Sequence, residues 1–330
     1  MRKVITALCL ACLGAPASAA ESLPRLVMVV DRIDEVRNLP ALLAESLGYF
    51  RDEGLLVTLV EGRDEVPTDQ MLADGRADAS MAFYHHTFMS QAAGIPTRAV
   101  VTLGISPALK LMVADRLKDQ IKIPADLKGR KIFTGGANSG KTTTANWLLH
   151  HAGLGDDDIV RLPLQDRDKM AAALQSGEAD AIVAHEPDAS YYQAGHVAHV
   201  IADITTPEGT RKALGSLYPT TSVYLTDAYI KAHPREVQHL VNALVRTLKY
   251  INSHKPGEVM AALPKEAAGK NPAIFLQDMT EDMAMFATDG LMPEQAARTE
   301  LKIMADFQPK YAPTDFAETF TNHFVEAALK

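Results

Sequence analysis

The sequence contains one eight-residue pattern twice, as Leu72-Ala-Asp-Gly-Arg-Ala-Asp-Ala79 and, 102 positions later, as Leu174-Gln-Ser-Gly-Glu-Ala-Asp-Ala181. Both copies read L-x-x-G-x-A-D-A. In each copy we expect the glycine to end a helix, because glycine adopts the left-handed conformation that closes helices. The apolar run that follows each copy, at 79–83 and 181–184, predicts a buried strand.

The segments before the two copies follow the same order. The first copy is preceded by predicted strands at 25–30 and 55–60 and a helix at 39–47; the second by strands at 130–133 and 159–164 and a helix at 139–152. Each half is therefore β-α-β-α-β, which builds a small, mostly parallel sheet flanked by helices. Chance is the alternative, since the shared pattern is short and alanine is common, but the matching order argues against it. We predict an α/β protein of two lobes.

The predicted lobes are residues 21–109 together with 226–330, and residues 110–225. Hinge strands are expected near 109–114 and 222–225. An amphipathic helix is predicted over 232–253, and two later segments, 276–286 and 316–329, should pack over the lobes. In open α/β sheets ligands bind beyond the carboxyl ends of the strands, so the ligand should lie between the lobes.

That rule nominates the residues that directly follow strands. The ligand-binding candidates are Asp31, Arg32, Tyr84, His85, His86, Asn138, Ser139, Gly140, Lys141, Thr142, His185 and Glu186. Arg32 suits a carboxylate or sulfonate, whereas Asp31 suits a ligand amine. A metal site is not expected, because adjacent histidines on an extended chain point to opposite faces. No cofactor is expected.

The stretch from Gly135 to Thr142 also fits the phosphate-binding pattern G-x-x-x-x-G-K-[ST], with a predicted strand before it and a helix after it. A nucleotide-binding enzyme is therefore an alternative. Against it, the best candidate for a strand ending in a magnesium-binding aspartate is the weak one at 200–203. Unpaired N–H groups at the start of a helix attract any anion. Lys141 would then help to bind an anionic solute, or else be an ordinary solvated lysine.

The N-terminus resembles a secretory signal. Arg2 and Lys3 precede eleven apolar residues, and small residues follow up to Ala20. The apolar run is too short to cross ~30 Å of hydrocarbon. Cleavage after Ala19 or Ala20 would remove both cysteines, Cys9 and Cys12, although Cys12 is a poor candidate for lipidation. The remainder would carry 31 basic and 41 acidic side chains, a net charge of −10, which argues against nucleic-acid binding.

The stretch Ile123-Pro-Ala-Asp-Leu-Lys-Gly-Arg-Lys-Ile132, the second repeat copy and Glu186-Pro187 together resemble periplasmic solute-binding proteins of ABC importers. The resemblance spans about residues 25–260 and is nearest to the nitrate, sulfonate, taurine and thiamine-precursor type. It implies the two-lobed periplasmic-binding-protein fold, type II-like, in a periplasmic monomer that closes over a small solute and docks on an inner-membrane permease. Tyr84-His85-His86 departs from the small turn often found there, which favours an aromatic or carboxylated organic solute.

The same fold is shared by fungal-type pyrimidine synthases, which are an enzyme alternative. Those enzymes carry a cysteine-rich motif, and a chain that has lost Cys9 and Cys12 contains no cysteine. The sequence shows no nucleophile-elbow pattern either. We therefore expect a binding protein for a sulfonate, carboxylate or pyrimidine and not an enzyme.

Overall fold

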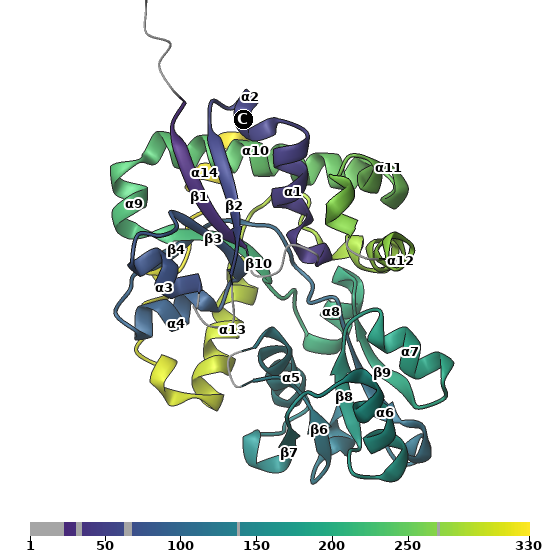
Figure 1. Cartoon of the computed structure of the whole chain (residues 1–330). Coiled ribbons are helices and arrows are strands. Elements are labelled where there is room, and N and C mark those ends of the chain that lie inside the picture. Colours follow the sequence, from purple (N-terminus) through teal and green to yellow (C-terminus); the bar gives the residue numbers. More distant parts are fainter. Residues whose placement is uncertain (1–22, 31–34, 63–67, 137–138, 269–270) are drawn as a thin grey trace, which may run out of the picture.

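The structure is a computed structural model that describes residues 23–30, 35–62, 68–136, 139–268 and 271–330. It contains two five-stranded sheets, and the helices around each sheet form one lobe (Figure 1). The sequence pattern predicts this division. The predicted signal segment at 1–20 lies outside the described residues. Within the described part, no helix has both the length and the apolar character needed to cross a membrane.

The first sheet has the order β2-β1-β3-β10-β4. Its strands are β1 (Arg25–Val30), β2 (Leu56–Glu61), β3 (Ala79–Phe83), β4 (Thr97–Thr102) and β10 (Thr221–Thr226). The second sheet has the order β7-β6-β8-β5-β9. Its strands are β5 (Leu109–Ala114), β6 (Lys131–Phe133), β7 (Val160–Leu162), β8 (Ala181–Ala184) and β9 (Ala198–Ile204).

The two sheets have the same architecture. In each, three parallel strands from one repeat unit are followed by an antiparallel strand that has just crossed from the other lobe: β10 in the first sheet and β5 in the second. The predicted β-α-β-α-β order is confirmed in both halves. The sheets are more mixed than predicted, because each crossing strand runs opposite to the strands on both sides of it.

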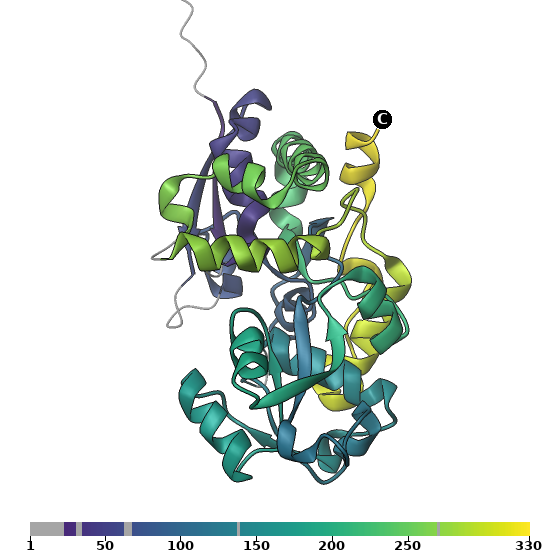
Figure 2. The same cartoon turned by 90° about the vertical axis from the view of Figure 1, so that its right-hand side faces the viewer.

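Helices of the first lobe cover both faces of its sheet (Figure 2). They are α1 (Leu39–Ser46), α2 (Tyr49–Asp52), α3 (Thr68–Ala73), α4 (His86–Ala92), α9 (Asp227–Ala232), α10 (Pro234–Ser253), α11 (Pro256–Ala261), α12 (Pro272–Asp282) and α14 (His323–Ala328), with the short 3-10 helix η1 (Val36–Asn38) ahead of α1. The second lobe has α5 (Gly140–His151), α6 (Arg167–Ser176), α7 (Asp188–Ala194) and α8 (Pro207–Leu214).

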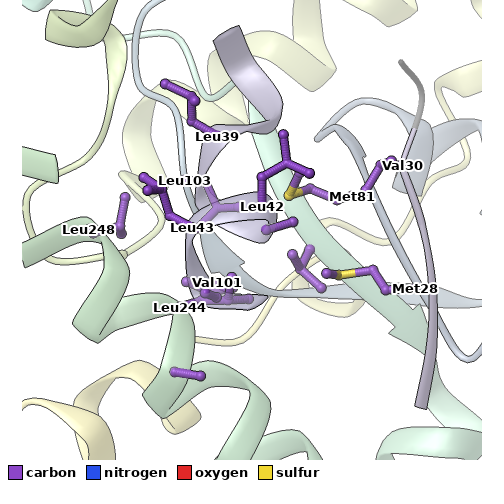
Figure 3. Close-up of a cluster of buried hydrophobic side chains, with 14 of the residues drawn as sticks. Met28, Val30, Leu39, Leu42, Leu43, Met81, Val101, Leu103, Leu244 and Leu248 are labelled. Carbon is purple, nitrogen blue, oxygen red and sulfur yellow. The ribbon is translucent and has the colours of Figure 1, made fainter. Parts of the chain in front are cut away.

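The largest helix, α10, stabilises the first lobe through the stripe predicted from the sequence. All six predicted positions are buried: Val237, Leu240, Ala243, Leu244, Leu248 and Ile251. Leu244 and Leu248 pack with Leu43 of α1 and with Val101 and Leu103 (Figure 3). Burying each such side chain contributes roughly 1.5–3 kcal/mol, so this contact holds α10 on the sheet.

The chain crosses between the lobes through two paired connectors, 103–108 and 215–220. The connectors are hydrogen-bonded to each other: the amide of Thr220 donates to the carbonyl of Gly104 (2.8 Å), and that of Tyr218 to the carbonyl of Ile105 (3.2 Å). They lie just before β5 and β10. The segments expected to be hinges are therefore interior strands of the sheets, and the crossing itself precedes them.

A further helix, α13 (Glu294–Phe307), contacts both lobes. It packs against α5 of the second lobe, and its Ala296 and Ile303 belong to that lobe's core. On its other side Ala297 and Met304 join the core of the first lobe. This helix therefore joins the lobes beside the connectors, at the point where Figure 1 shows it next to α5.

Candidate functional site

The turn between β6 and α5 uses its own polar side chains to start the helix. Ser139 is the N-cap, and its hydroxyl accepts a hydrogen bond from the amide of Thr142 (3.2 Å). The Thr142 hydroxyl accepts one from the amide of Gly135 (3.0 Å). A side chain at Gly135 would lie 2.0 Å from the Ser139 hydroxyl, so only glycine fits there. Asn138 lies outside the described residues.

This turn faces the end of β3 across the lobe boundary. A methyl group added at Gly140 would lie 2.6 Å from the ring of Phe83, the last residue of β3. The guanidinium carbon of Arg37, from η1, lies 5.5 Å from the centre of the same ring. The end of β3 and the turn after β6 therefore meet across the lobe boundary, and the ring of Phe83 contacts both a glycine of the second lobe and a cation of the first.

In the described parts of this stretch, 135–136 and 139–142, two features do not suit a phosphate site. In a phosphate-binding loop the residue at the position of Thr142 binds magnesium, but here its hydroxyl bonds to Gly135 within the turn. The ring of Phe83 also covers Gly140, where a phosphate would approach the backbone. The geometry thus weighs against the nucleotide alternative.

Two cationic side chains, Lys141 and Arg37, lie near this contact. Burial lowers the pKa of Lys141, and Arg37 lowers it further, whereas Asp188 and Glu35 raise it. Arg37 itself forms an ion pair with Glu35. Arg37 was not among the predicted residues; Asp31 and Arg32, which were, lie outside the described residues. The position of Arg37 in η1, the first described element after β1, is the signal that would have identified it.

In the Tyr84-His85-His86 turn, the first two side chains are fully buried and the third is half-buried. Tyr84 is fully buried and its hydroxyl lies 2.6 Å from that of Thr319, so this predicted ligand residue packs inside the first lobe instead. His85 is also fully buried, with Nδ1 3.6 Å from a carboxylate oxygen of Glu300 on α13. His86 is half-buried and its ring stacks on His85 at 5.0 Å.

The stacking corrects one sequence argument. The chain at these histidines is a turn leading into α4, so the rings lie together and do not point to opposite faces as on an extended strand. Among the described residues, no three histidine, cysteine or acidic side chains are placed to bind one metal ion.

His185 and Glu186 follow β8 in the second lobe. His185 donates from Nδ1 to the carbonyl of Glu186 (2.8 Å), which leaves Nε2 as a hydrogen-bond acceptor. Burial, and the nearby charge of Lys141, lower the pKa of His185 to about 4, so its ring is neutral at pH 7. The Glu186 carboxylate accepts from Lys110 (2.5 Å) and from the amide of Ser190 (2.9 Å).

An acidic group on α12 completes this region, and sequence patterns did not reveal it. Glu281 pairs with Lys110 (3.2 Å) from across the lobe boundary. Asp278 and Asp282 lie on the same helix. Burial raises the pKa of Asp278 to about 6 and that of Asp282 to about 8, and the surrounding carboxylates add to both shifts. Lys110 therefore bridges the lobes amid an excess of acidic side chains.

The profile of the family described as "NMT1/THI5 like" matches residues 37–258. The chain belongs to this family. The match covers both turns of the lobe contact. It confirms the resemblance on which the prediction rests.

Solved structures confirm the fold class. A protein from Bordetella bronchiseptica RB50 is 30% identical, with a TM-score of 0.74 over 92% of this chain and 96% of that one. A putative periplasmic sulfonate-binding protein, SsuA, from Methylobacillus flagellatus KT superposes with a TM-score of 0.71 over 94% of both chains at 18% identity. The chain therefore has the two-lobed periplasmic-binding-protein fold.

A curated relative bears on the expectation that the chain is not an enzyme. The 4-amino-5-hydroxymethyl-2-methylpyrimidine phosphate synthase of Aspergillus parasiticus is 25% identical over 291 residues, 82% of this chain and 81% of that protein. The prediction that the chain is not an enzyme is contradicted by this relationship. The absence of cysteine outside the predicted signal was too narrow a criterion.

The contact between Gly140 and Phe83 leads to a first testable prediction. Gly140→Ala should weaken binding of an interlobe ligand about tenfold, equivalent to ~1.4 kcal/mol, because its methyl group must displace the Phe83 ring. Titration calorimetry measures the loss. Gly136→Ala is the matched control, since a methyl group there meets nothing within 4 Å. Equal affinities of the two variants would mean that this contact does not adjoin the ligand.

Proposed function

We propose that the chain is an exported solute-binding protein that delivers a small anionic or aromatic organic solute to an ABC importer by hinge closure. The observation that carries this proposal is the contact between the lobes at Phe83. Arg37 of the first lobe lies over the ring, Gly140 of the second lobe lies against it, and the charge of Arg37 acts on Lys141, the residue after Gly140. Cations bind carboxylates and sulfonates, and an aromatic ring packs against a planar ligand. The site residues proposed for binding are Arg37, Phe83, His86, Lys141 and His185, together with Asp31, Arg32 and Asn138 from the predicted set.

The two connectors, 103–108 and 215–220, are proposed to be the hinge about which the lobes close. The moving bodies would be residues 21–109 with 226–330, and residues 110–225, with α13 spanning both. A solute that contacts both lobes only in the closed form shifts the population toward it, and the permease would recognise that form. The sulfonate-binding description of the Methylobacillus protein supports a sulfonate among the candidate classes. Export through a signal removed near Ala19 or Ala20, and action as a monomer, belong to the same proposal.

A second function is pyrimidine synthesis, which the similarity to the Aspergillus synthase over most of both chains favours. A synthase converts its substrate into a new compound, whereas a binding protein releases its solute unchanged. Mass spectrometry of the purified chain with its bound material, before and after incubation, would distinguish turnover from simple release.

The binding function is tested by thermal unfolding of the processed chain with sulfonates, carboxylates, pyrimidines and ATP–magnesium. A solute at a hundred times its Kd should stabilise the protein by about 2.7 kcal/mol, and Lys141→Gln should reduce that effect. Trp147 provides a second signal, because it lies on α5 behind the turn and its ring contacts Tyr218 at 4.7 Å. A response to ATP–magnesium alone would favour the nucleotide alternative and contradict the proposal.

A further inference from the structure

A group of acidic side chains surrounds Lys110 at the lobe contact. The ammonium group of Lys110 contacts Glu186 at 2.5 Å and Glu281 at 3.2 Å. Lys110 lies on β5 of the second lobe and Glu281 on α12, at the edge of the first lobe nearest the second (Figure 1). Glu186 and Glu281 therefore share the positive charge of Lys110.

Asp278 and Asp282 are left without such a partner. They lie four residues apart on α12, and residues at this spacing share one face of a helix. One carboxylate oxygen of each, Oδ1, is buried and has no hydrogen-bond partner in the described structure. Asp282 is only 6% exposed. A buried carboxylate without a donor is costly, so it either takes up a proton or binds a cation.

The same region lies close to the proposed anion-binding cations. The charge of Asp188 acts on Lys141, on His185 and on Asp278, so these groups lie near one another. His185, neutral and bonded through Nδ1, keeps Nε2 as an acceptor. The lobe contact therefore holds cations and hydrogen-bond acceptors close together.

The acceptors suit nitrogen donors better than a metal ion. A bound metal needs at least three ligands converging on one point, and the described residues contain no such group. An ammonium or amidinium group instead forms separate N–H bonds to carboxylates that do not converge. An organic cation thus fits the arrangement.

We propose that Asp278 and Asp282 form a subsite for a cationic N–H group of the solute. This inference rests on the proposed binding function and specifies the solute further: an anionic end at Lys141 and Arg37, a middle part against Phe83, and an ammonium or amidinium end at α12. Opening of the lobes would separate Glu281 from Lys110 and give the solute access to the two aspartates.

Matched pairs of anions test the subsite by calorimetry. The pairs are 4-methylbenzoate with 4-(aminomethyl)benzoate, and butanesulfonate with 3-aminopropanesulfonate. At pH 8, where a large fraction of Asp282 is ionised, the amino member of a pair should bind about tenfold more tightly to the wild-type chain. Asp278→Asn and Asp282→Asn should each reduce that preference to less than about threefold while leaving the amine-free anion unaffected. The exposed Asp119→Asn is the control.

The pH dependence gives a readout that a purely structural role would not produce. Affinity for the amino member should rise as pH increases toward 8, because Asp282 must lose its proton to bind an ammonium. Besides burial, the charges that act on the Asp282 carboxyl group are those of Asp278, Glu186, Glu281 and Lys110. Because the rise in affinity comes from ionisation of Asp282 itself, Asp282→Asn should remove most of it.

The outcomes separate the two proposals. If the amine-free anions bind and the amino group adds nothing, or if its benefit survives in both variants, the subsite is overturned and the binding function stands. If no anion of either kind binds, the binding function fails and the subsite fails with it. Circular dichroism confirms that the asparagine variants fold, as expected for substitutions that remove repulsion between buried carboxylates.

Discussion

Lys110→Met is expected to lower the free energy of unfolding by about 3–5 kcal/mol, because it leaves two carboxylates inside the lobe contact without their cation. Lys110 is 12% exposed, and its partner Glu186 is 1% exposed. Attraction to Glu186 and Glu281 outweighs burial and raises the pKa of Lys110, which shows that the charged form is the favoured one. Denaturant unfolding at pH 7 measures the change.

A matched surface pair provides the control for this prediction. Lys128 lies 3.1 Å from Asp158 but is 72% exposed. Exposed ion pairs contribute about 0–1 kcal/mol, so Lys128→Met should have little effect. Lowering the pH toward 5 should restore part of the stability of Lys110→Met, since protonation removes the uncompensated charges. A loss from Lys110→Met as small as that from Lys128→Met would mean that the buried pair contributes no more than a surface pair.

The repeat made the fold predictable, because a repeated β-α-β-α-β unit depends on local patterns. Gly177 closes α6 in the left-handed conformation with φ of 91°, as its place in the repeat predicts. The ends of β3 and β8 were predicted to the residue. Since ligand-binding turns follow strand ends, the meeting of the 83–86 and 135–142 turns was also within reach of the sequence.

The acidic half of the lobe contact could not be predicted in this way. Lys110 and Glu281 are 171 residues apart, and nothing in the local pattern of α12 indicates which lobe its polar face meets. The same holds for Glu300, because nothing in the local pattern of α13 indicates that this helix packs between the lobes. Tertiary docking of the C-terminal helices decides both. It also decides the surroundings of Tyr84, which follows β3 as the rule requires but is buried against Thr319.

Glu300 gives the second large effect, a change in how stability depends on pH. Its carboxyl group is fully buried, with His85 from the first lobe at 3.6 Å and Tyr218 from a connector beside it. Burial raises its pKa well above the usual range, and the lowering by Tyr218 is smaller. The folded protein therefore holds Glu300 protonated at a pH where the unfolded chain, with an ordinary pKa of about 4.3, releases the proton.

The sign of the effect follows from that difference. A group with a raised folded pKa contributes its full stability below the unfolded value, and the contribution falls as pH rises toward the folded value. Glu300→Gln keeps the shape of the neutral acid but cannot ionise. Between pH 5 and 7 the wild-type chain should therefore lose up to about 1.4 kcal/mol per pH unit more than the variant. Glu294→Gln, on the same helix with a side chain 64% exposed, should leave the wild-type slope unchanged. Parallel slopes for wild type and Glu300→Gln would instead mean that Glu300 is ionised and paired with a protonated His85, so that an ion pair and not a neutral acid joins α13 to the first lobe.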